Sequence, residues 1–174
     1  MTNFIYSEAE RVLKKYKTRD PFELLGAIGA ITRISGEYPR DGLKGYCTIL
    51  NRCAYAVING NLDEDGQKVA AGHEAAHLIL HRKQIISSPM KALQDFNLFD
   101  NSGRTEREAN AFLADFLVPD ETALDAVSAA QDYFTAAGKL SIPAPLFAFK
   151  LYSMTRRGYP MRNSLDLDSK FLSV

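Results

Sequence analysis

Tryptophan is absent from this chain of 174 residues, which contains only two cysteines, Cys47 and Cys53. Long apolar runs are also missing. The longest, at residues 24–31, has eight residues with two glycines among them, whereas a helix that crosses a bilayer needs about 20. Charged residues occupy the N-terminal positions where a secretion signal would be apolar. The sequence therefore predicts neither a membrane segment nor export, and we expect a cytoplasmic protein with free thiols.

An excess of one charge is lacking as well. The 21 lysines and arginines balance 21 aspartates and glutamates, which argues against a dedicated nucleic-acid-binding protein, because such proteins usually have a basic excess. Lys150, Arg156 and Arg157 form a local basic group, which a solvated helix end explains better than a DNA contact. With 46% hydrophobic and 24% charged residues, the composition is that of an ordinary globular protein.

Periodicity predicts an α+β fold that is mostly helical. Apolar residues recur at helical spacing in six segments, at 4–16, 21–29, 64–82, 105–118, 123–137 and 145–157. Asp20 and Asp63 precede two of them as N-caps. We expect one domain over residues 1–157, including a helical C-terminal part, and a polar, poorly defined tail over 158–174.

Three short apolar or β-branched runs predict a small antiparallel sheet that contains a hairpin. They lie at residues 30–35, 45–50 and 53–58. Residues 83–104 then lose regular periodicity, and we expect a long loop there, with one short helix at 91–95.

The three histidines of the chain are clustered within nine residues, and the first two frame the motif His73-Glu74-Ala75-Ala76-His77. Residues four apart lie on one face of a helix, so both imidazoles can bind one metal ion. Glu74, about 100° round the helix, can reach a water molecule bound to that ion. The alternative is a helix with two buried, hydrogen-bonded histidines, but the small residues around the motif leave space for a metal ion.

A catalytic zinc ion usually has three protein ligands, and this motif supplies two. His81 lies about 6 Å further along the same helix, too far to bind the same ion, so we interpret it as a packing or supporting residue. The next acids are Glu106 and Glu108. Glu106 is on the face of its helix that carries small and apolar residues, where a carboxylate must be paired or bound to a metal. We therefore predict Glu106 as the third ligand.

Asn110, one turn further on, can orient Glu106 or accept a hydrogen bond from a ligand imidazole. In the alternative interpretation, Thr105 caps the helix and both glutamates are ordinary first-turn acids, which fits Glu108 better. The loop between the two ligand-bearing helices has its ends fixed near the metal. Because Phe96, Leu98 and Phe99 can bury apolar surface, we predict that this loop covers the site as a lid.

Three segments together resemble the ImmA/IrrE family of metallopeptidases, over roughly residues 20–157. They are Val57-Ile58-Asn59, the run from Ala71 to His81 around H-E-x-x-H, and the E-x-x-A-N-x-F helix from Glu106 to Pro119. The resemblance implies a zincin-like domain and a cytoplasmic zinc-dependent endopeptidase of phages, mobile elements and bacteria, which cleaves a helix-turn-helix repressor. It also implies that His73, His77 and Glu106 bind zinc and that Glu74 is the general base.

The chain departs from the family at a few positions. Ala76 stands where many members have glycine, and Val69-Ala70 replaces an aromatic-hydroxyl pair; we interpret both as packing variants. The 28 residues between His77 and Glu106 are many for the family. The competing hypothesis is a degenerate, non-catalytic module that binds and sequesters a regulator.

A peptidase also needs a group that stabilises the oxyanion, and the sequence leaves several candidates open. These are His81, Tyr46, Tyr55, Tyr152 and the arginines. A substrate strand can add to an edge of the small sheet, which is a common way of binding extended peptides.

Overall fold

The structure, a computed structural model, describes residues 2–88, 92–95, 97, 99, 103–130 and 132–159. Its helices are α1 (Thr2–Tyr16), α2 (Pro21–Ala27), α3 (Glu64–Leu80), α4 (Arg82–Ser87), α5 (Arg104–Leu117), α6 (Asp120–Ala129), α7 (Tyr133–Lys139) and α8 (Ala144–Arg156). Its strands are β1 (Ala30–Ser35), β2 (Gly45–Leu50), β3 (Cys53–Asn59) and β4 (Ala92–Asp95). The α+β prediction is confirmed. Among the described residues, no helix has the length and apolarity of a membrane span.

The sheet is mixed, with the strand order β1-β3-β2-β4. Strands β2 and β3 form the predicted hairpin, in which Asn51 and Arg52 have φ values of 49° and 69°, typical of a tight two-residue turn. The prediction of a purely antiparallel sheet was wrong, because β1 runs parallel to β3. Strand β3 lies between β1 and β2, and periodicity identifies a strand without identifying its neighbour.

Residues 83–104 differ from the predicted loop with a helix at 91–95. They contain most of α4, and Ala92–Asp95 is an edge strand antiparallel to β2. This strand depends on a partner more than 40 residues away, which a local pattern cannot reveal. Phe96 and Leu98, on which the lid prediction rests, lie outside the described residues, whereas Phe99 is partly buried against the main core.

The remaining helices follow the sequence closely, with one exception. Asp20 accepts hydrogen bonds from the backbone N–H groups of Phe22 and Glu23, and Asp63 caps α3. The segment predicted as one helix over 123–137 is divided into α6 and α7, because Asp132 caps a new helix by accepting a hydrogen bond from the Thr135 backbone N–H.

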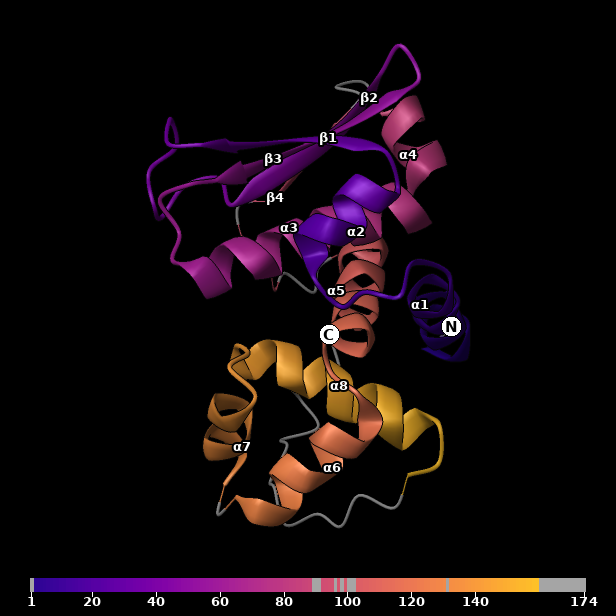
Figure 1. Cartoon of the computed structure of the whole chain (residues 1–174), viewed down its shortest axis with the longest axis vertical. Helices are drawn as coiled ribbons and strands as arrows, with labels where there is room; N and C mark the ends of the chain where they lie inside the picture. The colour runs from indigo at the N-terminus through magenta and orange to yellow at the C-terminus, as the bar shows by residue number, and fades with distance from the viewer. Residues whose placement is uncertain are drawn as a thin grey trace.

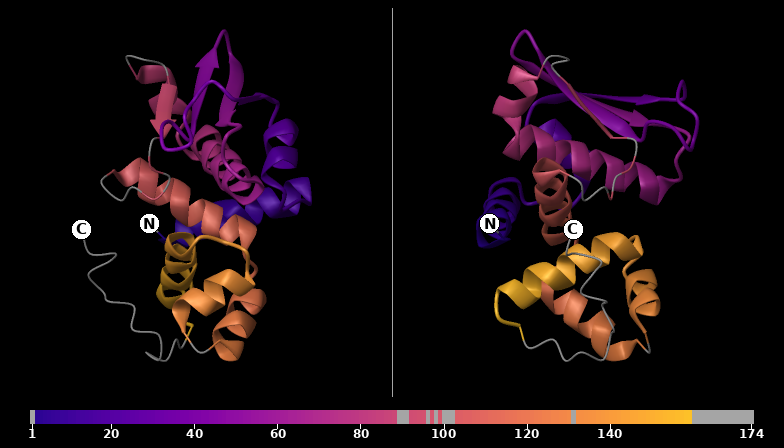
Figure 2. Two further views of the ribbon diagram at one scale, coloured as in Figure 1. Left: turned by 90° about the vertical axis from the view of Figure 1, so that its left-hand side faces the viewer. Right: turned by 180° about the vertical axis from the view of Figure 1, so that it is seen from behind.

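Helix α3 lies between two layers, with the sheet on one side and α2 and α5 on the other (Figures 1 and 2). Every residue from Val69 to Leu78 is buried. A Cβ atom at Gly72 would lie 2.3 Å from Leu113 Cδ1, so a larger residue at this position would force the Leu113 side chain of α5 to move. Helix α5 also packs against α1 and α8, and it thereby joins the sheet layer to the C-terminal helices. Helix α3, which carries the H-E-x-x-H motif, is therefore held in place by the sheet on one side and by α2 and α5 on the other.

Candidate metal centre

Helix α3 places His73 and His77 one turn apart, and both side chains are fully buried. Their Nε2 atoms lie 3.0 Å from each other, so both rings point toward the same place. Helix α5 crosses α3 and brings the Glu106 carboxylate to that place. Glu106 Oε2 lies 3.1 Å from His73 Nε2 and 3.4 Å from His77 Nε2. The structure thus brings together the three residues that the sequence predicts as ligands.

Asp95, at the end of β4, is a fourth member of the group, which the sequence analysis missed. Its Oδ1 lies 3.5 Å from His73 Nε2, and its Oδ2 lies 3.8 Å from His77 Nε2. One potential ligand atom from each of the four residues lies within 4.8 Å of all the others. No spacing rule indicates Asp95, because it reaches the histidines through the pairing of β4 with β2.

A second set of contacts fixes the orientation of the two imidazoles. Asn110 Oδ1 lies 3.1 Å from His73 Nδ1 and can accept its hydrogen, which is one of the two roles predicted for Asn110. His77 Nδ1 lies 3.0 Å from His81 Nδ1, and His81 Nε2 lies 3.1 Å from Glu108 Oε2. With hydrogens on both Nδ1 atoms, the two Nε2 lone pairs face each other.

This arrangement fits a tetrahedral metal ion. Metal–ligand bonds of 2.0–2.2 Å place the ligand atoms of a tetrahedron about 3.3 Å apart. The distances of 3.0, 3.1 and 3.4 Å among His73, His77 and Glu106 agree with that value. Two facing lone pairs beside a buried carboxylate are unfavourable without a positive charge between them, so the chemistry of the donor set also favours a cation.

A family model for peptidase M78, described as an IrrE N-terminal-like domain, matches residues 55–151, which is more than half of the chain. The chain belongs to this IrrE-like peptidase family. It is also 32% identical, over 116 residues, to a protein named "Uncharacterized immunity region protein 2" from Bacillus phage phi105, and the match covers 67% of this chain and 69% of the phage protein. No solved structure matches the chain significantly.

The electrostatics of this IrrE-like site also favour positive charge. Burial alone would lower the pKa of His73, but contacts with the carboxylates of Asp95 and Glu106 outweigh it and raise the pKa to about 9. Burial likewise opposes ionisation of Glu106, yet hydrogen bonds with His73 and His77 hold its pKa far below the usual value. The two histidines therefore keep the Glu106 carboxylate ionised, although burial alone would favour its neutral form.

Glu74 is next to His73 in the chain and is fully buried. Neither of its carboxylate oxygens has a hydrogen-bond partner among the described residues. Burial and the nearby charge of Asp95 raise its pKa well above the usual value. A Cβ atom at position 45 would lie 2.7 Å from Glu74 Oε1, so Gly45 provides the space for this side chain.

The alternatives for the first turn of α5 are resolved by its contacts. Gly103, and not Thr105, is the N-cap residue, and it makes no side-chain hydrogen bond. Glu108 is no solvated first-turn acid, because it contacts His81 and accepts a hydrogen bond of 2.8 Å from Arg104 Nε. His81 is buried in this chain of contacts, between His77 and Glu108.

The three tyrosines that the sequence offers for stabilising the oxyanion lie on three different elements of this IrrE-like protein. Tyr46 lies on β2 opposite Gln94 of the edge strand, and Tyr55 lies on β3. Tyr152 is exposed on α8. Of the three, Tyr46 is on the strand that pairs directly with the strand of Asp95.

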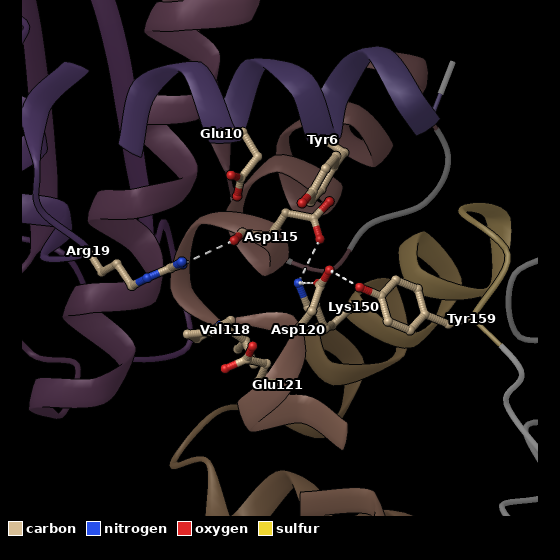
Figure 3. A pocket seen from close by; sticks show the side chains of 10 residues that line it. Tyr6, Glu10, Arg19, Asp115, Val118, Asp120, Glu121, Lys150 and Tyr159 are labelled. Atoms are coloured by element: carbon tan, nitrogen blue, oxygen red, sulfur yellow. Dashed lines mark hydrogen bonds and ion pairs between the residues drawn. The ribbon is translucent and has the colours of Figure 1, made fainter. Parts of the chain in front are cut away.

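The predicted solvated helix end is wrong for Lys150, which is only 1% exposed. Its Nζ donates hydrogen bonds to Asp115 Oδ1 at 3.0 Å and to Asp120 Oδ1 at 2.6 Å, and Figure 3 shows this contact with Asp120 at the wall of a polar pocket. Arg157 also donates to Asp120, and its guanidinium stacks on the Tyr6 ring. Two of the three basic residues are therefore used inside the protein, and only Arg156 is exposed.

Proposed function

We propose that this protein is a zinc-dependent endopeptidase, in which His73, His77 and Glu106 bind the ion and Glu74 is the general base. One observation carries the proposal: two imidazoles and a carboxylate from separate helices converge at 3.0–3.4 Å in a buried site beside a second, unpartnered carboxylate. Membership of a peptidase family supports a hydrolytic role.

Each residue of the site has a task in peptide hydrolysis. A bound zinc ion would acidify water and polarise the peptide carbonyl. Glu74 accepts a proton as the water attacks the carbonyl carbon, and it returns that proton to the leaving amine. Asn110 and His81 hold the two imidazoles with Nε2 directed at the metal position.

The proposed substrate is a helix-turn-helix repressor in the cytoplasm. The ImmA/IrrE resemblance implies this class of substrate, and the relative named as a phage immunity-region protein agrees with it. The proposal is tested by incubating the purified protein with the repressor encoded next to its gene, with and without a chelator. We expect cleavage that the chelator abolishes and added zinc restores. Tight binding of the repressor without cleavage under any condition would instead support the sequestering module.

Metal binding is expected to depend on Glu106 far more than on Glu108, two residues away on the same helix turn. Glu106→Gln removes a carboxylate that lies 3.1 Å from His73 Nε2, whereas Glu108→Gln keeps an acceptor for His81. We expect one zinc ion per chain in the wild type, nearly complete loss in Glu106→Gln, and a smaller loss of affinity, up to about 100-fold, in Glu108→Gln. Elemental analysis and competition with a chromogenic chelator measure this, and the reverse order would identify Glu108 as the ligand.

A further inference from the structure

The centre has one carboxylate more than hydrolysis requires. A catalytic zinc site normally has three protein ligands and leaves the fourth position to water or substrate. Here a fourth side chain, that of Asp95, faces the two histidines across 3.5 and 3.8 Å. These distances are longer than those from the two histidines to Glu106. A small movement of the Asp95 carboxylate would remove the difference.

Asp95 is buried beside the histidines with one of its two carboxylate oxygens unpaired within the described part of the chain. Its side chain is 5% exposed, and Oδ2 has no hydrogen-bond partner among the described residues. The backbone holds it in place, because Asp95 lies opposite Gly45 in the sheet and its carbonyl accepts a hydrogen bond of 2.7 Å from the Lys44 N–H. A buried carboxylate with an unpaired oxygen is costly unless it is neutralised or bound to a metal.

The position of Asp95 places it within the same cluster as the other candidate ligands. One potential ligand atom from each of His73, His77, Asp95 and Glu106 lies within 4.8 Å of all the others. A metal ion bound by the two histidines and Glu106 would therefore have the Asp95 carboxylate beside it.

We propose that Asp95 is a fourth protein ligand, and that the resting metal centre is closed by His73, His77, Glu106 and Asp95. This inference rests on the proposed metal site and adds a regulatory feature to it. In the closed form, the chain itself fills the position that the attacking water needs. Asp95 must withdraw before hydrolysis, and it lies on a strand of four residues that is paired with β2 and forms the end of the sheet, so that its withdrawal disturbs few hydrogen bonds.

The test uses the full-length protein loaded with Co²⁺, whose visible absorption reports the number and type of ligands, and acetohydroxamate as a probe of an open coordination position. In the wild type we expect the Co²⁺ spectrum to respond only weakly to acetohydroxamate. Asp95→Asn should bind the probe at least about tenfold more tightly and should hold the metal itself about 10- to 100-fold less tightly. Gln94→Ala, an exposed change on the same strand, is the matched control and should behave like the wild type.

The stability of the metal-free protein gives a second measurement that does not depend on activity. Asp95→Asn removes the proposed ligand while keeping the volume of the side chain, so the melting temperature of the variant should gain less from added metal than that of the wild type. If wild type and Asp95→Asn bind acetohydroxamate and metal equally, Asp95 is no ligand, although the proposed function stands. If the wild type binds no metal at all, the proposed function fails together with the inference.

Discussion

Glu74→Gln is expected to reduce peptide-bond cleavage about 10²- to 10⁴-fold while zinc content and fold are unchanged, because glutamine keeps the volume of the side chain and cannot accept the proton. Glu74 is buried and lies about 100° round α3 from His73. In the proposed site it can therefore act on water near the ion, but it cannot replace a ligand. Cleavage of the repressor, followed by gel electrophoresis beside elemental analysis, measures the effect.

Glu64→Gln is the matched control, because Glu64 lies in the first turn of the same helix and pairs with Lys68 in an exposed salt bridge. It should cleave at the wild-type rate. Binding of the repressor should survive in Glu74→Gln, since the site that holds the peptide gains no charge. Cleavage by Glu74→Gln at a rate close to that of the wild type would exclude Glu74 as the base.

Lys150→Met is expected to destabilise the protein by about 3–5 kcal/mol, the largest effect on folding that we anticipate from a single substitution. The substitution leaves the Asp115 carboxylate buried at 3% exposure, with Ser153 Oγ as a donor at 2.7 Å and Arg157 Nη2 at 3.7 Å, but without its closest positive partner. Urea denaturation followed by circular dichroism measures the change.

Lys68→Met provides the comparison, because it removes a lysine from an exposed pair and should leave the midpoint unchanged. The double variant Lys150→Met with Asp115→Leu should recover much of the loss, since both members of the buried pair are then apolar. A loss in Lys150→Met no larger than that in Lys68→Met would show that the buried pair contributes nothing.

Helix α3 could be predicted because the sequence patterns that specify it are local. The H-E-x-x-H spacing, the Asp63 cap and the uninterrupted helical period all lie within 20 residues, and the structure forms α3 as one helix that ends at Leu80. The face of α5 that carries Glu106 followed from the same 3.6-residue period. Local patterns of this kind are visible in a sequence without knowledge of what packs against them.

The features that the sequence did not predict depend on strand pairing and side-chain contacts between residues that are distant in the chain. Asp95 lies beside His73 and His77 because β4 pairs with β2, and the direction of β1 depends on β3 being placed between β1 and β2. Lysine is usually a surface residue, but Lys150 is buried against Asp120 and Asp115, which lie 30 and 35 residues away in the chain. Tertiary pairing of this kind overrides the average behaviour of the residue type.

The two thiols lie on neighbouring strands of the sheet but differ fully in access to solvent. Cys53 is exposed at the start of β3, whereas Cys47 is buried in β2 opposite Leu93 of the strand that carries Asp95. A thiol reagent should therefore label Cys53 in the native protein at once, while Cys47 reacts only in molecules in which the sheet has opened around β2. The labelling rate of Cys47 in the native protein, divided by its rate in the unfolded chain and read by mass spectrometry, gives the free energy of that local opening in a chain that has no tryptophan to report it.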